Sequence, residues 1–176
     1  MSRGELLEML KASGALTFGD FTLASGKQSP YYVDIKRAIT RPDVLRSIAR
    51  AMAPLVRTAD RIAGVELGAV PIAAAVAMET GKPYVIVRKK RKEHGTSKDF
   101  EGDLHRGERV AFVEDVVTTG GTLAKAVVRL RSHGVTITDA IAVVDREEGG
   151  RESLAVIGVA LHALLSAKEL LAAARP

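Results

Sequence analysis

The chain has 176 residues, a length typical of one domain that buries its own core. It contains no Cys, which excludes a disulfide scaffold, a thiolate metal site and a Cys nucleophile. The formal net charge of +5 favours an anionic partner. No stretch approaches the ~18 apolar residues of a membrane span, and acids interrupt the opening MSRGELLEML, so we expect a soluble, cytoplasmic protein without a membrane partner.

The N-terminal part of the chain predicts a helix, two strands and a second helix. Ser2 and Glu5 form a capping-box pattern, which predicts a short amphipathic helix. Two short strands are predicted over 18–23 and 31–35, on either side of a turn-prone segment. Pro42 precedes apolar residues at helical spacing, and this predicts the second helix.

From residue 61 onward, predicted strands and helices alternate. Strands are predicted over 61–65, 84–87, 110–113 and 137–144, and helices over 71–81, 122–133 and after the capping pattern of Ser166 and Glu169. Such alternation is typical of βαβ units, in which a parallel sheet is covered by helices on both faces.

A basic stretch over 88–102 interrupts this alternation. It is polar and long for a connection in a compact domain, and such connections are usually functional or disordered. Its composition alone favours a solvated run of charges.

The strongest local signal for function lies in residues 110–122. A buried strand ends in Glu114 and Asp115, and a turn rich in Thr and Gly and then a helix follow. Amides at the start of a helix and nearby hydroxyls suit a phosphate. Paired acids can accept hydrogen bonds from vicinal ribose hydroxyls or help to hold a divalent cation. The segment therefore predicts a ribose 5-phosphate site, whereas an ordinary polar turn would leave the paired acids unexplained.

The residues over 113–122, Val-Glu-Asp-Val-Val-Thr-Thr-Gly-Gly-Thr, resemble the signature of type I phosphoribosyltransferases, which bind 5-phosphoribosyl 1-diphosphate (PRPP). Residues 21–34, 64–71, 88–95 and 144–146 resemble segments of the orotate-specific members, in the same order. The resemblance implies an α/β fold in which a central, mostly parallel sheet of about five strands is flanked by helices. It also implies a single domain over 1–176, with a small hood mainly from 1–40 and a flexible catalytic loop at about 89–101.

The reaction implied by this resemblance is transfer of ribose 5-phosphate from PRPP to orotate, giving orotidine 5′-phosphate and diphosphate in pyrimidine (UMP) biosynthesis. Mg²⁺ is the implied cofactor, held mainly by substrate and water, with no direct protein ligand expected. The family also implies a homodimer in which part of the loop reaches the neighbouring subunit's site.

The resemblance also assigns roles to individual residues. Lys92, His94 and Asp115 match catalytic positions, and Thr118 and Arg146 match orotate-binding positions. The PRPP-binding positions are Arg88, Lys89, Lys92, His94, Glu114, Asp115, Val116, Val117, Thr118, Thr119, Gly120, Gly121 and Thr122. A guanidinium fork at Arg146 suits the planar carboxylate of orotate, although a surface Arg in a turn is the alternative.

The chain departs from the family pattern at two positions. Ala24 and Gly68 stand where bacterial members commonly carry lysines that contact the ligand. We therefore expect these segments to contribute fewer positive charges to ligand binding. Tyr32 and Val33 lie where the family contacts the pyrimidine, but a core or interface role for the Tyr is also compatible. Lys27 either contacts the substrate or faces solvent.

Two alternative functions remain open. One is a phosphoribosyltransferase that acts on another base, such as a purine. The other is a non-enzymatic regulator that binds nucleic acid. The densest basic cluster contains no aromatic residue until Phe100 and is unlike a nucleic-acid surface, so we expect no nucleic-acid partner.

Overall fold

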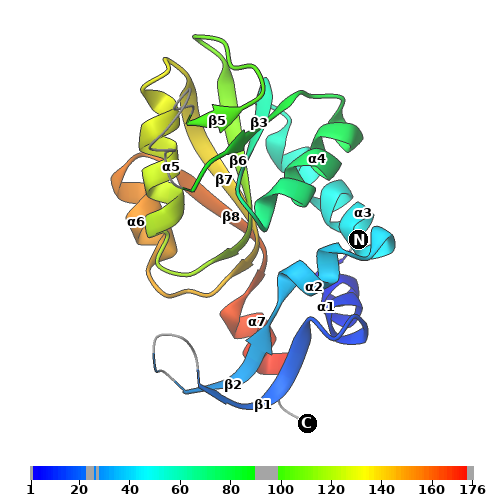
Figure 1. Cartoon of the computed structure of the whole chain (residues 1–176). Coiled ribbons are helices and arrows are strands. Elements are labelled where there is room, and N and C mark those ends of the chain that lie inside the picture. The colour runs from blue at the N-terminus through cyan, green and yellow to red at the C-terminus, as the bar shows by residue number, and fades with distance from the viewer. Residues whose placement is uncertain (1, 23–25, 27, 90–98, 174–176) are drawn as a thin grey trace.

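A six-stranded sheet forms the centre of the computed structural model, which describes residues 2–22, 26, 28–89 and 99–173 (Figure 1). The strands are β3 (Arg61–Val65), β4 (Tyr84–Val87), β5 (Phe100–Glu101), β6 (Arg109–Val117), β7 (Thr136–Asp145) and β8 (Ala160–Ser166), in the order β5-β4-β3-β6-β7-β8. All neighbouring pairs are parallel except β4 and β5. The predicted fold class is confirmed, and the sixth strand is the two-residue edge strand β5.

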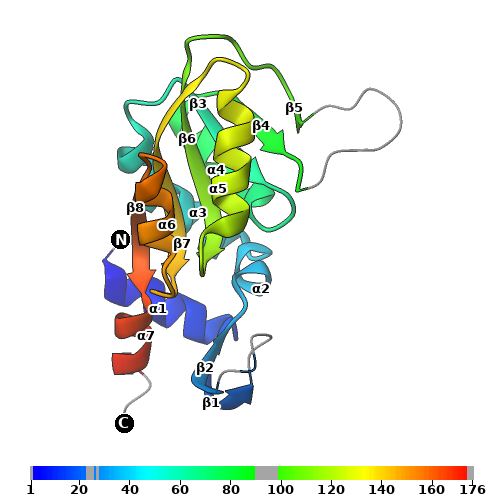
Figure 2. The ribbon, with the colours of Figure 1, turned by 90° about the vertical axis from the view of Figure 1, so that its left-hand side faces the viewer.

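Helices cover both faces of this sheet, as Figures 1 and 2 show. On one face lie α3 (Pro42–Met52), η1 (Ala53–Val56) and α4 (Ala69–Thr80), and on the other lie α5 (Gly121–Arg131) and α6 (Gly150–Val156). Neighbouring strand residues alternate between the two layers: Val113 and Ile141 belong to the hydrophobic cluster of α3 and α4, whereas Phe112 and Ala140 belong to that of α5 and α6. No helix within the described residues is long and apolar enough to cross a membrane.

A small subdomain, which we call the hood, lies beyond the carboxyl ends of the parallel strands (Figure 1). It consists of α1 (Arg3–Ala12), the antiparallel hairpin of β1 (Leu16–Thr22) and β2 (Gln28–Val33), α2 (Ile35–Ile39) and the C-terminal α7 (Ala167–Ala173). Leu6, Leu10 and Tyr31 of the hood are buried in the same hydrophobic cluster as Val113 and Ile141 of the sheet. The hood is therefore continuous with the core of one sheet face.

Both predicted capping boxes are confirmed. Ser2 Oγ accepts a hydrogen bond from the Glu5 amide at 3.2 Å, and Glu5 Oε2 accepts one from the Ser2 amide at 2.6 Å. At α7 the Ser166 amide donates to Glu169 Oε2 at 2.7 Å, and the Glu169 amide donates to Ser166 Oγ at 3.4 Å. Each box fixes the first residue of its helix.

The structure corrects the prediction in two respects. The strand predicted over 110–113 and ending in the acid pair continues to Val117, because it pairs with β7 as far as Asp145. Five elements were not predicted: α2, η1, β5, α6 and β8. Helices of five and seven residues are too short to show helical periodicity, and the Ala and Leu residues of β8 suit a helix equally well.

Candidate active site

A glycine-rich turn links β6 to α5 and opens onto a small pocket of about 90 Å³. Thr118 and Thr119 are exposed at its rim, and Gly120 adopts φ 75°, a left-handed conformation that glycine reaches without strain. No side chain in the described part of the chain caps the first amides of α5, and Gly120, Gly121 and Thr122 at the start of this helix line the pocket. An anion bound here would meet these amides and the positive end of the helix dipole.

The turn is packed tightly against the loop that follows β7. A Cβ atom placed on Gly150 would lie 2.5 Å from Val117 Cγ1 and 2.6 Å from the Thr118 carbonyl oxygen. A Cβ atom on Gly120 would lie 3.0 Å from the Gly150 carbonyl oxygen. Only glycine therefore fits at position 150. We did not predict this requirement, although the Gly149–Gly150 pair is visible in the sequence.

The acid pair lies beside this turn, at the carboxyl end of β6. Asp115 is buried and its Oδ1 accepts a hydrogen bond from the Val116 amide at 2.8 Å, while Glu114 Oε1 accepts one from the Asp115 amide at 3.0 Å. Burial, followed by the hydrogen bond and charge of Asp115, raises the pKa of Glu114 well above its ordinary value. The protonated form that this favours can donate a hydrogen bond as well as accept one.

Two residues from other elements contact the Asp115 carboxylate. Lys36 of α2 places its Nζ 3.4 Å from Asp115 Oδ2. Gly68, which precedes α4, approaches so closely that a Cβ atom there would lie 2.1 Å from the same oxygen. Gly68 therefore makes room for Asp115. Lys36 was not predicted as a site residue, because no local motif links it to the acid pair.

Arg146 follows β7 directly and lies next to the turn, since its amide donates to the Val117 carbonyl oxygen at 2.8 Å. Its side chain is only 11% exposed, with Nε 3.2 Å from Glu148 Oε1 and the guanidinium carbon 5.1 Å from the centroid of the Tyr31 ring. The alternative of an exposed surface Arg is therefore wrong. The structure joins Arg146 to the hood strand β2 through Tyr31, a contact that sequence reasoning missed.

The neighbouring Tyr32 is half-exposed, so its interpretation as a core residue is wrong. Its ring centroid lies 5.7 Å from that of Phe21, across the hairpin. Ala24 and Lys27 lie outside the described residues.

The two ends of the predicted catalytic loop are tied to the sheet. The Arg88 side chain pairs with Glu101, and its amide donates to the Asp99 carbonyl oxygen at 3.0 Å. The Lys89 amide donates to Glu66 Oε1 at 2.7 Å, which connects the carboxyl ends of β3 and β4. Residues 90–98, including Lys92 and His94, lie outside the described part of the chain, and their roles stay predictions.

Helix α5 adds cations close to Lys89. A hollow of about 390 Å³ is lined by Val65, Lys89, Thr122, Lys125 and Arg129. Arg129 lies 3.9 Å from Asp99 Oδ1, and this contact links α5 to the loop end. Lys125 and Arg129 were not predicted, although their spacing from Thr122 places all three on one face of a helix.

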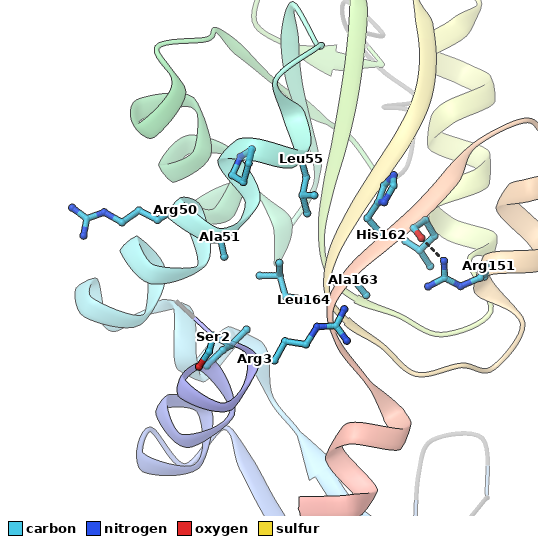
Figure 3. Close-up of a pocket in the computed structure, with 12 residues that line it drawn as sticks. Ser2, Arg3, Arg50, Ala51, Leu55, Arg151, His162, Ala163 and Leu164 are labelled. Carbon is cyan, nitrogen blue, oxygen red and sulfur yellow. Dashed lines mark hydrogen bonds between the residues drawn. The ribbon is translucent and has the colours of Figure 1, made fainter.

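A second hollow, of about 560 Å³, lies between α1, α3 and β8 and contains no predicted site residue (Figure 3). Three of its basic side chains are paired with carboxylates: Arg3 with Glu169 at 2.8 Å, Arg151 with Asp145 at 3.2 Å and His162 with Asp139 at 2.9 Å. These pairs neutralise the hollow, so it is less suited to an anion than the pocket at α5.

The carboxyl edge of the sheet thus combines an anion pocket at a helix start, paired acids and several cations. This combination defines an α/β protein with a site for a phosphorylated sugar.

Comparison with known proteins narrows this class. A family model described as the phosphoribosyl transferase domain matches residues 37–171. An orotate phosphoribosyltransferase of Pyrococcus horikoshii is 47% identical over 98% of this chain and 95% of the relative. The chain therefore belongs to the phosphoribosyl transferase family and, within it, to the orotate phosphoribosyltransferases.

Solved structures agree with this placement. Orotate phosphoribosyltransferase from Aeropyrum pernix has a TM-score of 0.85 and 38% identity, covering 96% of this chain and 97% of that one. The Mycobacterium tuberculosis orotate phosphoribosyltransferase in complex with PRPP has a TM-score of 0.78 and 31% identity, covering 96% and 98% of the two chains.

Proposed function

We propose that this protein transfers ribose 5-phosphate from PRPP to orotate, giving orotidine 5′-phosphate and diphosphate, a step of pyrimidine (UMP) biosynthesis. The main observation in support is that the α5 pocket, the acid pair and Arg146 lie together at the carboxyl ends of the neighbouring strands β6 and β7. In the reaction, N1 of orotate bonds to C1 of the ribose and loses its proton, while the C1–O bond breaks and diphosphate leaves with the electron pair.

The ribose 5-phosphate part of PRPP fits the end of β6. The amides and hydroxyls over 118–122 hold the 5-phosphate at the start of α5. Glu114 and Asp115 hold the ribose hydroxyls, since Glu114 lines that pocket, Asp115 is its neighbour on β6, and both can accept hydrogen bonds. The chain thereby fixes the sugar while positive charge develops at C1, so its contribution is chiefly position and electrostatics.

Orotate is placed by the end of β7. The Arg146 guanidinium, held over Tyr31, offers a planar fork to the orotate carboxylate, and Glu148 Oε1 lies 3.2 Å from its Nε. Thr118 directly follows the end of the adjacent strand β6 and supplies a second contact. The carboxylate distinguishes orotate from uracil and from purines.

The departing diphosphate is neutralised by cations near the loop. Lys89 lies in the basic hollow with Lys125 and Arg129, and we assign Arg88, Lys92 and His94 to the same task. We also propose that the protein forms a homodimer in which the loop reaches the neighbouring subunit. We further propose that the enzyme acts in the cytoplasm.

Mg²⁺ fits as the cofactor of this reaction. The described residues contain no group of three or more His, Asp or Glu that could hold a metal ion by themselves. Glu114 and Asp115 are assigned to the ribose hydroxyls, so the ion would be held mainly by substrate oxygens and water. When bound, Mg²⁺ supplies Lewis acidity that offsets the negative charge of diphosphate.

A base-specificity assay tests the proposal. The purified protein is given PRPP and Mg²⁺ with orotate, adenine, hypoxanthine, xanthine or uracil, and diphosphate release is measured. We expect turnover of orotate alone, lost when the metal is chelated. Turnover of a purine instead, or salt-sensitive nucleic-acid binding without any turnover, contradicts it.

A further inference from the structure

Position 68 is a glycine and brings no cation to the site of this protein. Asp115 Oδ2 would lie 2.1 Å from a Cβ atom on Gly68, and Asp115 Cγ would lie 2.7 Å from it. With the backbone as it stands, any side chain at position 68 would require the Asp115 carboxylate to shift. A cation next to this carboxylate must therefore come from another element.

Lys36 of α2 supplies that cation. Ile35 and Ala38 are buried in the core, which fixes α2 against β6, and the Asp34 carboxylate accepts a hydrogen bond from the Arg37 amide at the start of the helix. Lys36 lies on the open side, 65% exposed, with Nζ 3.4 Å from Asp115 Oδ2. This is the same oxygen that leaves no space for a side chain on Gly68.

The stability of the fold does not account for Lys36. An ion pair with one partner this exposed contributes little to the free energy of unfolding. An ammonium group has three N–H donors, and a contact with one carboxylate oxygen leaves two of them for a ligand. Among the charged pairs of the described residues, Lys36 is the one basic side chain within 4.0 Å of Asp115.

The stereochemistry of PRPP indicates which ligand atoms Lys36 meets. The diphosphate on C1 and the hydroxyls on C2 and C3 lie on one face of the ribose ring. A cation paired with the carboxylate that holds these hydroxyls therefore lies beside the diphosphate. Resting on the proposed function, we propose that Lys36 binds the diphosphate of PRPP and stabilises the charge that grows on it as the C1–O bond breaks.

Binding measurements with two ligands test this assignment. Titration calorimetry compares PRPP with ribose 5-phosphate, which lacks the diphosphate, for wild type, Lys36→Met, Lys36→Arg and Lys11→Met. Lys11 is a lysine of α1 that is paired with Glu8, and its variant removes the same charge elsewhere. We expect Lys36→Met to weaken PRPP binding at least about tenfold. Ribose 5-phosphate binding should be unchanged, and Lys36→Arg and Lys11→Met should bind PRPP like wild type.

Two results would overturn the assignment. Unchanged PRPP binding by Lys36→Met excludes a diphosphate contact, and equal weakening of both ligands makes Lys36 a residue that only positions Asp115. If the wild-type protein binds no PRPP, this result contradicts the proposed function itself, and the assignment of Lys36 falls with it. Thermal melting checks folding, and Lys36→Gln replaces the Met variant if that variant unfolds.

Discussion

At the scale of single residues, the Asp115 carboxylate is where three parts of the chain meet. One of its oxygens accepts from the Val116 amide, and the other faces Lys36 of the hood and Gly68 at the start of α4. Because these contacts surround the carboxylate, its position depends on all three segments. A change at any of them is expected to reach the ribose site.

Substitution of Arg146 by Lys tests the orotate contact. A Lys keeps the charge but loses the planar fork and its placement over the Tyr31 ring. We expect the KM for orotate to rise about tenfold or more, with PRPP affinity unchanged. Steady-state kinetics and calorimetry measure the two quantities. Arg151→Lys, in the second hollow, is the matched control, and equal orotate KM values for the two variants would argue against the contact.

Substitution of Gly68 by Ala tests the close approach to Asp115. The added Cβ atom must push the carboxylate away, so we expect weaker PRPP binding and a loss of about 1–3 kcal/mol in the free energy of unfolding. Gly4→Ala provides the contrast, because its Cβ atom meets only Ser2 Oγ, at 3.9 Å, and should stabilise α1 by about 0.5–1 kcal/mol. Urea unfolding and PRPP titration compare the variants. Undiminished PRPP affinity in Gly68→Ala would refute this role.

Some site residues could be predicted from sequence because they are contiguous. Glu114, Asp115 and the Thr and Gly residues over 118–122 lie on one strand, turn and helix start, so their local pattern already indicates a phosphate and sugar site. Lys36 and Tyr31 reach the site from the hood, and only tertiary folding brings them there. A local pattern contains no information about such contacts.

At the scale of elements, an ion pair between Arg61 and Glu108 links the amino ends of β3 and β6. This end of the strands is opposite to the carboxyl end at which the site lies. Arg61 is nearly buried, and its guanidinium donates to both Glu108 oxygens, at 2.7 and 2.8 Å. This hydrogen bonding lowers the pKa of Glu108 and raises that of Arg61. The pair therefore stabilises the fold above the ordinary Glu pKa, and its contribution is lost as the pH falls through the lowered value.

Glu108→Gln should consequently destabilise the protein without affecting the site. Removing one member leaves a buried, unpaired Arg61, which costs about 3 kcal/mol at neutral pH. The difference from wild type should shrink as the pH drops below the ordinary Glu range, and PRPP affinity should stay constant. Asp60→Asn breaks the exposed pair with Arg109 at the same sheet end and should have little effect. A difference that grows at acid pH would contradict the assignment.

The elements that sequence could predict were long or well bounded. α3, α4 and α5 have eleven or twelve residues, enough to show periodicity and end signals. The end of β6 was predicted too early, because acids are uncommon in buried strands and the acid pair was taken as the end of the strand. Pairing with β7 overrides that preference.

At the scale of the whole molecule, the positive charge is distributed unevenly. Five of the 26 lysines and arginines fall within residues 88–94, and Lys36, Lys125 and Arg129 also face the site region. The net charge of +5 predicted an anionic partner but not its size. Concentration of cations in one short segment of the sequence favours a small, highly charged substrate over a polynucleotide.

The shared hydrophobic cluster of hood and sheet has a consequence for how the protein denatures. Leu10 and Tyr31 pack into the same core as Val113 and Ile141, so the hood has no separate interior to preserve when the sheet melts. Hood and sheet should lose structure in one cooperative transition, with a single heat-capacity peak. The hood therefore does not unfold separately from the sheet. Substrate binding between hood and sheet should raise the melting temperature of the entire chain.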